Sequence, residues 1–372
     1  YAVSIGCVIM GLGYLIGWQS HNLATVNLMI YVVSVGTGLF KGNLAGLMGR
    51  MFENDDQMDS AFSVQYSFVN IGAFFGSAIM GAAYLSFFKN GDVYGFRQVF
   101  LVCGILVILG GILFTASYGK LHGQGKLPFK FRTDAQGNVI EDTSKTLKKE
   151  DVSSDKLTKK EWNGIWAICF VSFVSIIFWT FYEQQSGALP LYSEKYVDMS
   201  LAGVTLSPAH VFTAWNGLLC IFLSLGAAKL WATLAKRPQG DLTMFQKVAL
   251  SFGFLGLSYT VLIFMELTRG GGEHKASVLW LLFFGLLLTI GEICFSPLGN
   301  SFVSKVAPKK YLSLLLGVWI LATFASNKLS GYVQGFIENL GFMTIMVTFA
   351  VVSFITMGIL FLLSKSLNKL VE

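Results

Sequence analysis

The chain has 372 residues, of which 54% are hydrophobic and 13% are charged, and its mean hydropathy is +0.62. Soluble domains carry about 25% charged residues, so this composition excludes an ordinary soluble protein and indicates that lipid surrounds much of the chain. The formal net charge of +6 is not gathered in a basic segment with stacking aromatic residues, so we expect a lipid bilayer and no nucleic acid as partner.

Apolar runs of about 20 residues follow one another along the chain, and an α-helix of this length crosses a bilayer. They lack the alternation of barrel strands and are too long for them. The sequence therefore predicts an all-α membrane protein with ten spans. The runs cover residues 1–17, 26–49, 61–86, 97–118, 162–186, 210–234, 244–267, 277–301, 311–337 and 340–364.

A long polar segment divides these runs into four and six. We predict an incomplete N-terminal bundle over residues 1–118, a flexible cytoplasmic linker over 119–161 and a C-terminal six-helix bundle over 162–372. Two six-helix halves joined by a linker are common in large transporters, so we expect two further helices to precede Tyr1. Within the linker, the stretch DAQGN (134–138) is compatible with the tip of a small hairpin.

Lysine and arginine residues are unevenly shared between the two sets of alternating loops. Most of the 27 fall in the set that contains the linker and the C-terminus. Cytoplasmic loops carry the excess of positive charge, so we predict that the linker and C-terminus are cytoplasmic. The expected location is the inner (cytoplasmic) membrane of the cell, crossed many times.

Three ionisable side chains lie inside predicted spans, namely Lys41, Glu183 and Glu292. Each costs about 2.5–3.5 kcal/mol to insert, so such groups face a cavity or a partner and not lipid. One cation and two carboxylates match a solute that carries both a carboxylate and an ammonium group. The residues by themselves predict a transporter for a polar organic solute, of which a peptide is one possibility.

Two polar faces surround these charges. Thr289, Glu292, Ser296 and Asn300 share one helix face, and Pro297 removes a backbone donor that a straight helix needs. We predict a cavity wall there, the alternative being a polar seam between helices. A second stripe in the run 311–337 comprises Trp319, Thr323, Asn327, Ser330 and Gln334.

The roles of three other polar residues in the spans stay open. Asn70 and Asn216 are either contacts between helices or contacts to a ligand. Lys328 lies about 100° away from the stripe of its own helix and is left unassigned.

Glycines recur every four residues in two runs. Gly38, Gly42 and Gly46 form one ladder, and Gly72 and Gly76 begin another. Small residues at this spacing let helix backbones approach closely, so we predict that both ladders pack against a neighbouring helix.

Motifs of catalysis and metal binding are absent from the sequence. It contains no HExxH and no GxSxG, and its five cysteines stand singly in apolar runs without metal or redox spacing. We therefore predict that the chain is not an enzyme and binds no metal or organic cofactor.

Six stretches together resemble the proton-dependent oligopeptide transporters, a family of the major facilitator superfamily. They are GTGLFKGNLAGLMGRMF, DSAFSVQYSFVNIGAFFG, YGFRQVF, IFWTFYEQQSG, GEICFSPLG and LLGVWILA. The resemblance implies a major facilitator-type helical bundle in which this chain supplies family helices three to twelve. It also implies that protons are the coupling ion. The first-helix motif ExxERFxYY of the family is not found in the chain.

The resemblance implies roles for the charged residues. Lys41 would bind the carboxylate of a peptide and take part in proton coupling, and Glu292 would bind its amino group. Glu183 would bind protons and act in the outer gate. It follows that Lys41 should face a central cavity.

The resemblance also implies roles for neutral residues. Asn70 and Asn216 would hold the substrate, and Trp179 and Trp319 would line the pocket. Gly217 departs from the family pattern, because many relatives have proline after the asparagine.

The predicted function is proton-coupled uptake of di- and tripeptides by alternating access. One alternative is a major facilitator transporter of another solute, such as nitrate or an amphipathic drug. Another is a membrane subunit that binds a ligand without transporting it. The oligomeric state is not predicted.

Overall fold

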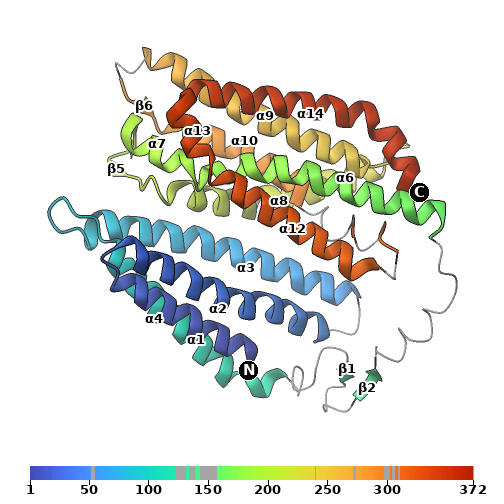
Figure 1. The fold of residues 1–372 in the computed structure, drawn as a ribbon, viewed down its shortest axis with the longest axis horizontal. Coiled ribbons are helices and arrows are strands. Elements are labelled where there is room, and N and C mark those ends of the chain that lie inside the picture. The colour runs from blue at the N-terminus through green and yellow to red at the C-terminus, as the bar shows by residue number, and fades with distance from the viewer. Residues whose placement is uncertain are drawn as a thin grey trace. The chain divides into compact units, whose positions relative to one another are not determined.

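A computed structural model describes residues 1–51, 55–121, 131–133, 139–142, 157–238, 240–270, 274–296, 302–303, 306–308 and 311–371. Its regular structure is almost entirely helical (Figure 1). The longer helices are α1 (Ala2–Trp18), α2 (Leu23–Arg50), α3 (Asp55–Ala82), α4 (Phe96–Ala116), α6 (Lys159–Tyr182), α8 (Val211–Ala235), α9 (Met244–Thr268), α10 (Leu279–Phe295), α12 (Leu312–Ser330) and α14 (Phe342–Val371).

Short elements join these helices. The short helical elements are the π-helix η1 (Ala83–Phe87), the 3₁₀ turns η2 (Tyr118–Leu121) and η3 (Glu183–Gln185), and the helices α7 (Ala188–Tyr196) and α13 (Val333–Leu340). The strands are β1 (Phe131–Thr133), β2 (Val139–Asp142), β3 (Val197–Asp198), β4 (Ser200–Leu201), β5 (Val204–Thr205) and β6 (Ala276–Ser277). The pairs β1–β2 and β4–β5 are antiparallel, and β3–β6 is parallel.

The strands β1 and β2 confirm a hairpin in the predicted linker. Phe131 lies opposite Asp142, and the register shifts between Arg132 and Thr133. The predicted turn DAQGN at 134–138 lies outside the described residues, as does most of the linker that we predict to be flexible.

The chain forms two compact units. The first comprises residues 1–69 and 79–153, and the second comprises residues 70–78 and 154–372. The change of unit between 153 and 154 falls inside the predicted linker. The middle of α3, residues 70–78, groups with the helices of the second half.

In the first unit, α1 packs against α2 and α4 through glycines. A Cβ on Gly36 would lie 2.8 Å from the carbonyl oxygen of Gly6 and 2.6 Å from the backbone nitrogen of Met10. A Cβ on Gly11 would lie 2.3 Å from Ile108 of α4. These helices therefore approach so closely that a larger residue at either glycine would collide with its neighbour.

The predicted packing of the two glycine ladders is wrong for the positions described. A Cβ at Gly38, Gly42, Gly72 or Gly76 would meet no described atom within 4 Å. The environment of Gly46 lies outside the described side chains. Spacing alone does not show which small residues face a helix, because the partner helix decides that.

Two glycines on α2 give a matched test of this contact. Changing Gly36 to alanine is expected to lower the free energy of unfolding by about 1–3 kcal/mol, because the added methyl collides with the backbone of α1. Changing Gly38 to alanine should be neutral or slightly stabilising, since alanine favours helix and the site is open. Thermal unfolding in detergent compares the two variants, and equal effects would contradict the packing.

In the second unit, α9 packs between α10 and α14, and α6 packs against α12. Aromatic rings fill its core. Phe178 of α6 stacks on Phe295 of α10 with ring centroids 4.4 Å apart, and Phe181 stacks on Phe349 of α14 at 4.0 Å. These contacts fix the face that α6 turns toward the other helices.

Side-chain caps set where α6 and α9 begin. Thr158 accepts a hydrogen bond from the backbone N–H of Glu161, whose carboxylate accepts from the Thr158 N–H. Thr243 and Gln246 make the same reciprocal pair at the start of α9. Such capping boxes satisfy backbone donors that the first turn leaves free.

Two predicted spans are interrupted toward one end. The run 162–186 ends in α6 and η3, with α7 following from Ala188, and the run 311–337 becomes α12 and the start of α13. A buried hydrogen bond joins the two interruptions, from Gln184 Nε2 to Ser330 Oγ at 2.9 Å. Mean hydropathy does not separate α6 from α7, because Lys159–Tyr196 as a whole is apolar enough to count as one span.

Seven described helices are long and apolar enough to cross a membrane. They lie in Leu23–Leu44, Ser67–Phe87, Phe96–Ala116, Lys159–Tyr196, Val211–Ala235, Met244–Thr268 and Phe342–Lys369. The helices α1 and α10 are apolar but shorter. The all-α membrane fold is confirmed, and the number of ten spans stays a prediction.

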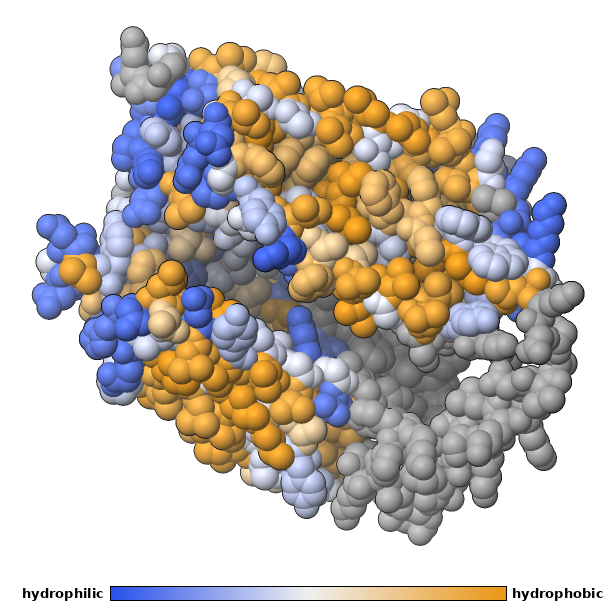
Figure 2. Space-filling model, viewed as in Figure 1, coloured by the Kyte–Doolittle hydropathy of each residue, from blue (hydrophilic) through white to orange (hydrophobic). Residues whose placement is uncertain are grey.

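The surface of α14 shows how such helices meet lipid. Figure 2 shows apolar side chains along its flank and hydrophilic residues near the C-terminus. Val351, Ile355 and Leu362 are exposed there, and Lys365 and Lys369 follow at the polar end. An apolar flank between polar ends is the pattern expected of a helix that crosses a bilayer.

Candidate functional site

The carboxylate of Glu292 on α10 lies at the centre of a polar cluster inside the second unit. Its Oε2 accepts hydrogen bonds from the Tyr182 hydroxyl at 2.6 Å and from Asn216 Nδ2 at 2.8 Å. Asn216 Nδ2 is also 3.1 Å from Thr289 Oγ1, and Cys220 Sγ is 3.9 Å from Glu292 Oε2. Three helices, α6, α8 and α10, therefore contribute to one site.

The partners of Glu292 in this cluster are uncharged. Among the described residues, Glu292 forms no ion pair, and its Oε1 has no hydrogen-bond partner. The side chain is half-buried. A carboxylate away from water needs a positive partner or strong donors, so this arrangement suits a site that receives a cation from a ligand.

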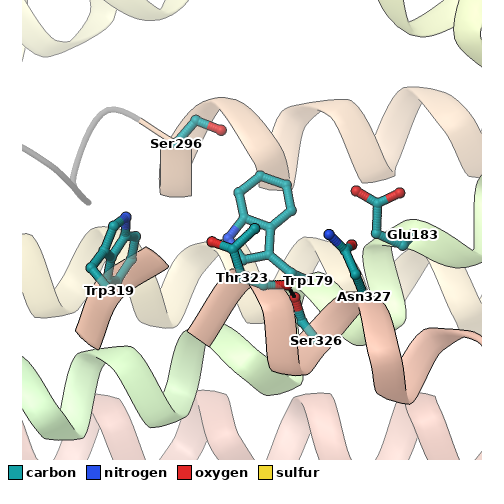
Figure 3. Close-up of a pocket in the computed structure, with 7 residues that line it drawn as sticks. All are labelled: Trp179, Glu183, Ser296, Trp319, Thr323, Ser326 and Asn327. Atoms are coloured by element: carbon teal, nitrogen blue, oxygen red, sulfur yellow. Dashed lines mark hydrogen bonds between the residues drawn. The ribbon is translucent and has the colours of Figure 1, made fainter. Parts of the chain in front are cut away.

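A cavity of about 240 Å³ lies between α6, α10 and α12 in the same unit. It is lined by Trp179, Glu183, Ser296, Trp319, Thr323, Ser326 and Asn327. Figure 3 shows Glu183 and Asn327 toward one end of this group and Trp319 at the other. Sites for whole drug-sized ligands measure about 300–1,000 Å³, so this cavity has room for part of a ligand.

Aromatic contacts connect the cavity with the Glu292 cluster. The Trp179 ring, which lines the cavity, meets the ring of Tyr182 edge-on at 5.1 Å. Trp179 also meets the ring of Phe295 at 5.9 Å. A carboxylate with neutral donors and an aromatic-walled cavity are thus adjacent features of one helix bundle.

The predicted polar face on α10 is brought into this site. Thr289 and Glu292 belong to the cluster, and Ser296 lines the cavity. Pro297 and Asn300 lie outside the described residues, so the predicted kink is untested.

The predicted stripe on the run 311–337 is divided by the structure. Trp319, Thr323 and Asn327 line the cavity, whereas Ser330 accepts the hydrogen bond from Gln184. Gln334 lies on α13 and donates to Glu338 at an exposed position, 2.9 Å away. The stripe is therefore a cavity wall only up to Asn327, because the end of α12 at Ser330 breaks the periodicity.

The predicted site residues of the first half differ in their surroundings. Lys41 lies on α2 in the first unit, exposed and without an ion pair to any described residue. Asn70 lies buried on the part of α3 that groups with the second unit, and its carbonyl oxygen would be 2.9 Å from a Cβ on Gly217. Glycine after Asn216 thus permits a close approach of two helix backbones. That Lys41 and Glu292 share one binding site stays a prediction.

Lys328, which the sequence left unassigned, lies next to the aromatic ring of Tyr332. Its Nζ lies 5.5 Å from the centre of the Tyr332 ring, within the range of a cation–π contact. Its side chain is not among those that line the cavity.

Tyr182, Cys220 and Ser326 also belong to the site and were not predicted from the sequence. The spacing of Asn216 and Cys220, four residues apart on α8, was a usable signal for a shared face. Nothing in the sequence distinguished Tyr182, one of 13 tyrosines. In the part of the chain that the structure describes, no three or more His, Cys, Asp or Glu residues form a group able to hold a metal ion.

A family model described as the POT family matches residues 2–146 and 121–348 of this chain. The chain belongs to the POT family. These matches span more than half of the sequence and confirm the resemblance carried by the motifs.

Curated relatives of the POT-family chain match most of its length. The uncharacterized transporter YclF of Bacillus subtilis is 25% identical over 391 residues, covering 95% of this chain and 76% of YclF. Dipeptide and tripeptide permease A of Escherichia coli is 26% identical over 364 residues, covering 90% of this chain and 70% of the permease.

Solved structures share the fold. A crystal structure of a peptide transporter POT in complex with sulfate has a TM-score of 0.84 at 24% identity, covering 100% of this chain and 80% of that one. A POT family transporter in complex with 5-aminolevulinic acid has a TM-score of 0.82 at 22% identity, covering 98% and 81%. The predicted major facilitator-type fold is thereby confirmed.

Proposed function

We propose that this protein takes up di- and tripeptides across the cytoplasmic membrane, coupled to protons, by alternating access. Membership of the POT family supports transport, and the relatives named dipeptide and tripeptide permease support the substrate class. The protein performs no chemical conversion in this proposal and needs no cofactor besides the coupled proton.

The observation that carries the proposal is the half-buried carboxylate of Glu292, whose hydrogen-bond donors among the described residues are neutral. The amino terminus of a peptide is an ammonium group that would supply the missing positive charge. Lys41 would bind the carboxylate at the other end. Because every di- and tripeptide carries both termini, this pair would recognise the class whatever its side chains.

The remaining site residues have supporting roles in the proposal. Asn70 and Asn216 hold the peptide, and Trp179 and Trp319 form a tolerant wall for its side chains. Glu183, at the junction of α6 and η3, acts in proton coupling and in closing the outer side.

Orientation and domain organisation complete the proposal. Bundles over residues 1–118 and 162–372 are joined by a cytoplasmic linker over 119–161, and the C-terminus is also cytoplasmic. The supporting observation is the excess of lysine and arginine on that side.

The coupling claim is tested with full-length protein in proteoliposomes. An inward proton gradient is expected to drive accumulation of a labelled dipeptide, and a protonophore should abolish it. Uptake of equal extent with and without the gradient would overturn the coupling. Competition by a panel of dipeptides, nitrate and an amphipathic drug identifies the substrate class, since only the peptides should compete.

A further inference from the structure

We propose that Tyr182 is a positioning residue that holds the Glu292 carboxylate so that one oxygen is left for the amino terminus of a peptide. This inference rests on the proposed function and adds a residue to its site. The juxtaposition that carries it is the hydrogen bond of 2.6 Å between the Tyr182 hydroxyl and Glu292 Oε2.

The two hydroxyl hydrogens of the cluster can be assigned from the contacts of Thr289 and Tyr182. Thr289 donates its hydroxyl hydrogen to the carbonyl oxygen of Gly285 at 2.8 Å, so toward Asn216 it acts as acceptor. Asn216 Nδ2 has two hydrogens and lies near three acceptors, namely Glu292 Oε2 at 2.8 Å and both Thr289 Oγ1 and the Tyr182 hydroxyl at 3.1 Å. A carboxylate oxygen only accepts, so the single hydroxyl hydrogen of Tyr182 goes to Glu292 Oε2. Tyr182 therefore has no hydrogen left to donate to a ligand.

Both strong donors meet the same carboxylate oxygen. Oε2 of Glu292 is held by Tyr182 and Asn216, whereas Oε1 has no partner among the described residues. Two donors on one oxygen restrict the rotation of the carboxylate plane, and they leave Oε1 as its available acceptor. A carboxylate that is oriented before binding loses less conformational entropy when an ammonium group binds, which favours a higher affinity.

The ring of Tyr182 is itself fixed by packing. It stacks on Phe178 with centroids 6.0 Å apart and meets Trp179 edge-on at 5.1 Å. The side chain is 7% exposed. Phenylalanine at this position would keep these ring contacts and lose only the hydroxyl, which donates to Glu292 and lies 3.1 Å from Asn216 Nδ2.

The chain offers a matched control in Tyr259. Its hydroxyl also makes a buried hydrogen bond of 2.6 Å, but the acceptor is the backbone carbonyl of Phe181. Tyr259 is fully buried and donates no hydrogen bond to Glu292. Tyr259→Phe therefore removes a comparable hydrogen bond without freeing the carboxylate.

The test measures binding of a dipeptide and of its N-acetylated form, which lacks the ammonium group, to the full-length protein. We expect Tyr182→Phe to weaken binding of the free dipeptide roughly five- to tenfold and to change binding of the acetylated form less than about twofold. Tyr259→Phe should leave the ratio of the two affinities unchanged. Equal effects of Tyr182→Phe on both ligands, or none on either, would overturn the positioning role.

The proposed function fails in a different way. If wild-type protein does not prefer the free dipeptide, or if Glu292→Gln keeps that preference, Glu292 is not the ammonium site and both proposals fall. If wild-type prefers the free dipeptide and Glu292→Gln abolishes that preference, a negative result for Tyr182→Phe removes only the role of Tyr182.

Discussion

Changing Lys41 to alanine is expected to abolish proton-driven uptake of a labelled dipeptide. Lys41 is the one charged residue in the span Leu23–Leu44, where a cation costs about 2.5–3.5 kcal/mol to insert. Its side chain is exposed and has no ion-pair partner among the described residues. The proposed role in binding the peptide carboxylate would account for a charge at this cost.

A second span lysine provides the control. Lys328 has the ring of Tyr332 as neighbour and is absent from the cavity wall, so Lys328→Ala should retain most of the uptake.

A binding experiment with a dipeptide and with its C-terminal amide shows whether the uptake defect of Lys41→Ala comes from the loss of carboxylate binding. Lys41→Ala should weaken binding of the free acid by about 30-fold or more and affect the amide far less, since removing one partner of a desolvated charge pair costs about 2–5 kcal/mol. Full uptake by Lys41→Ala would refute the assignment.

Changing Glu292 to glutamine is expected to weaken binding of dipeptides with a free amino terminus by about 30-fold or more. In the proposed site the variant would lose the negative charge that attracts the ammonium group, and such an attraction is worth about 2–5 kcal/mol in a desolvated pair. The glutamine oxygen still accepts from Tyr182 and Asn216, so the fold should persist. Isothermal titration measures the affinity, and thermal unfolding in detergent checks the fold.

Glu338 is a suitable control for the loss of a carboxylate. It lies exposed on α13 and accepts a hydrogen bond from Gln334 on the same helix. Glu338→Gln should leave peptide binding unchanged. An unfolding temperature for Glu292→Gln far below that of Glu338→Gln would show that Glu292 supports the fold, and unchanged affinity would contradict its role as the ammonium site.

Much of the helical framework was predictable because hydrophobicity and helix caps are local properties. The run 244–267 became α9 at Met244–Thr268, and Thr243 with Gln246 set its start. The ends of α6 and α12 were not predictable in the same way. Their breaks are joined by the bond between Gln184 and Ser330, which are 146 residues apart in the chain.

The candidate site shows the same division. Asn216 and Glu292 were identifiable in the sequence, because polar and charged groups inside apolar runs are costly and the family motifs mark them. Tyr182 was not, because a tyrosine in an aromatic run gives no sign that its hydroxyl meets a carboxylate 110 residues away. The glycines of α2 are a further example, since a Cβ on Gly36 would meet α1 and a Cβ on Gly38 would meet no described atom within 4 Å.

The sequence by itself determined the membrane environment, the helical class and the family, and it identified the ionisable residues inside apolar spans, namely Lys41, Glu183 and Glu292. It did so because the transfer of side chains into lipid depends on their own chemistry. Only the tertiary structure decided which glycines bring helices together, where spans break, and which oxygen of Glu292 is held by Tyr182 and Asn216. Those features depend on the mutual placement of distant helices, which local composition does not encode.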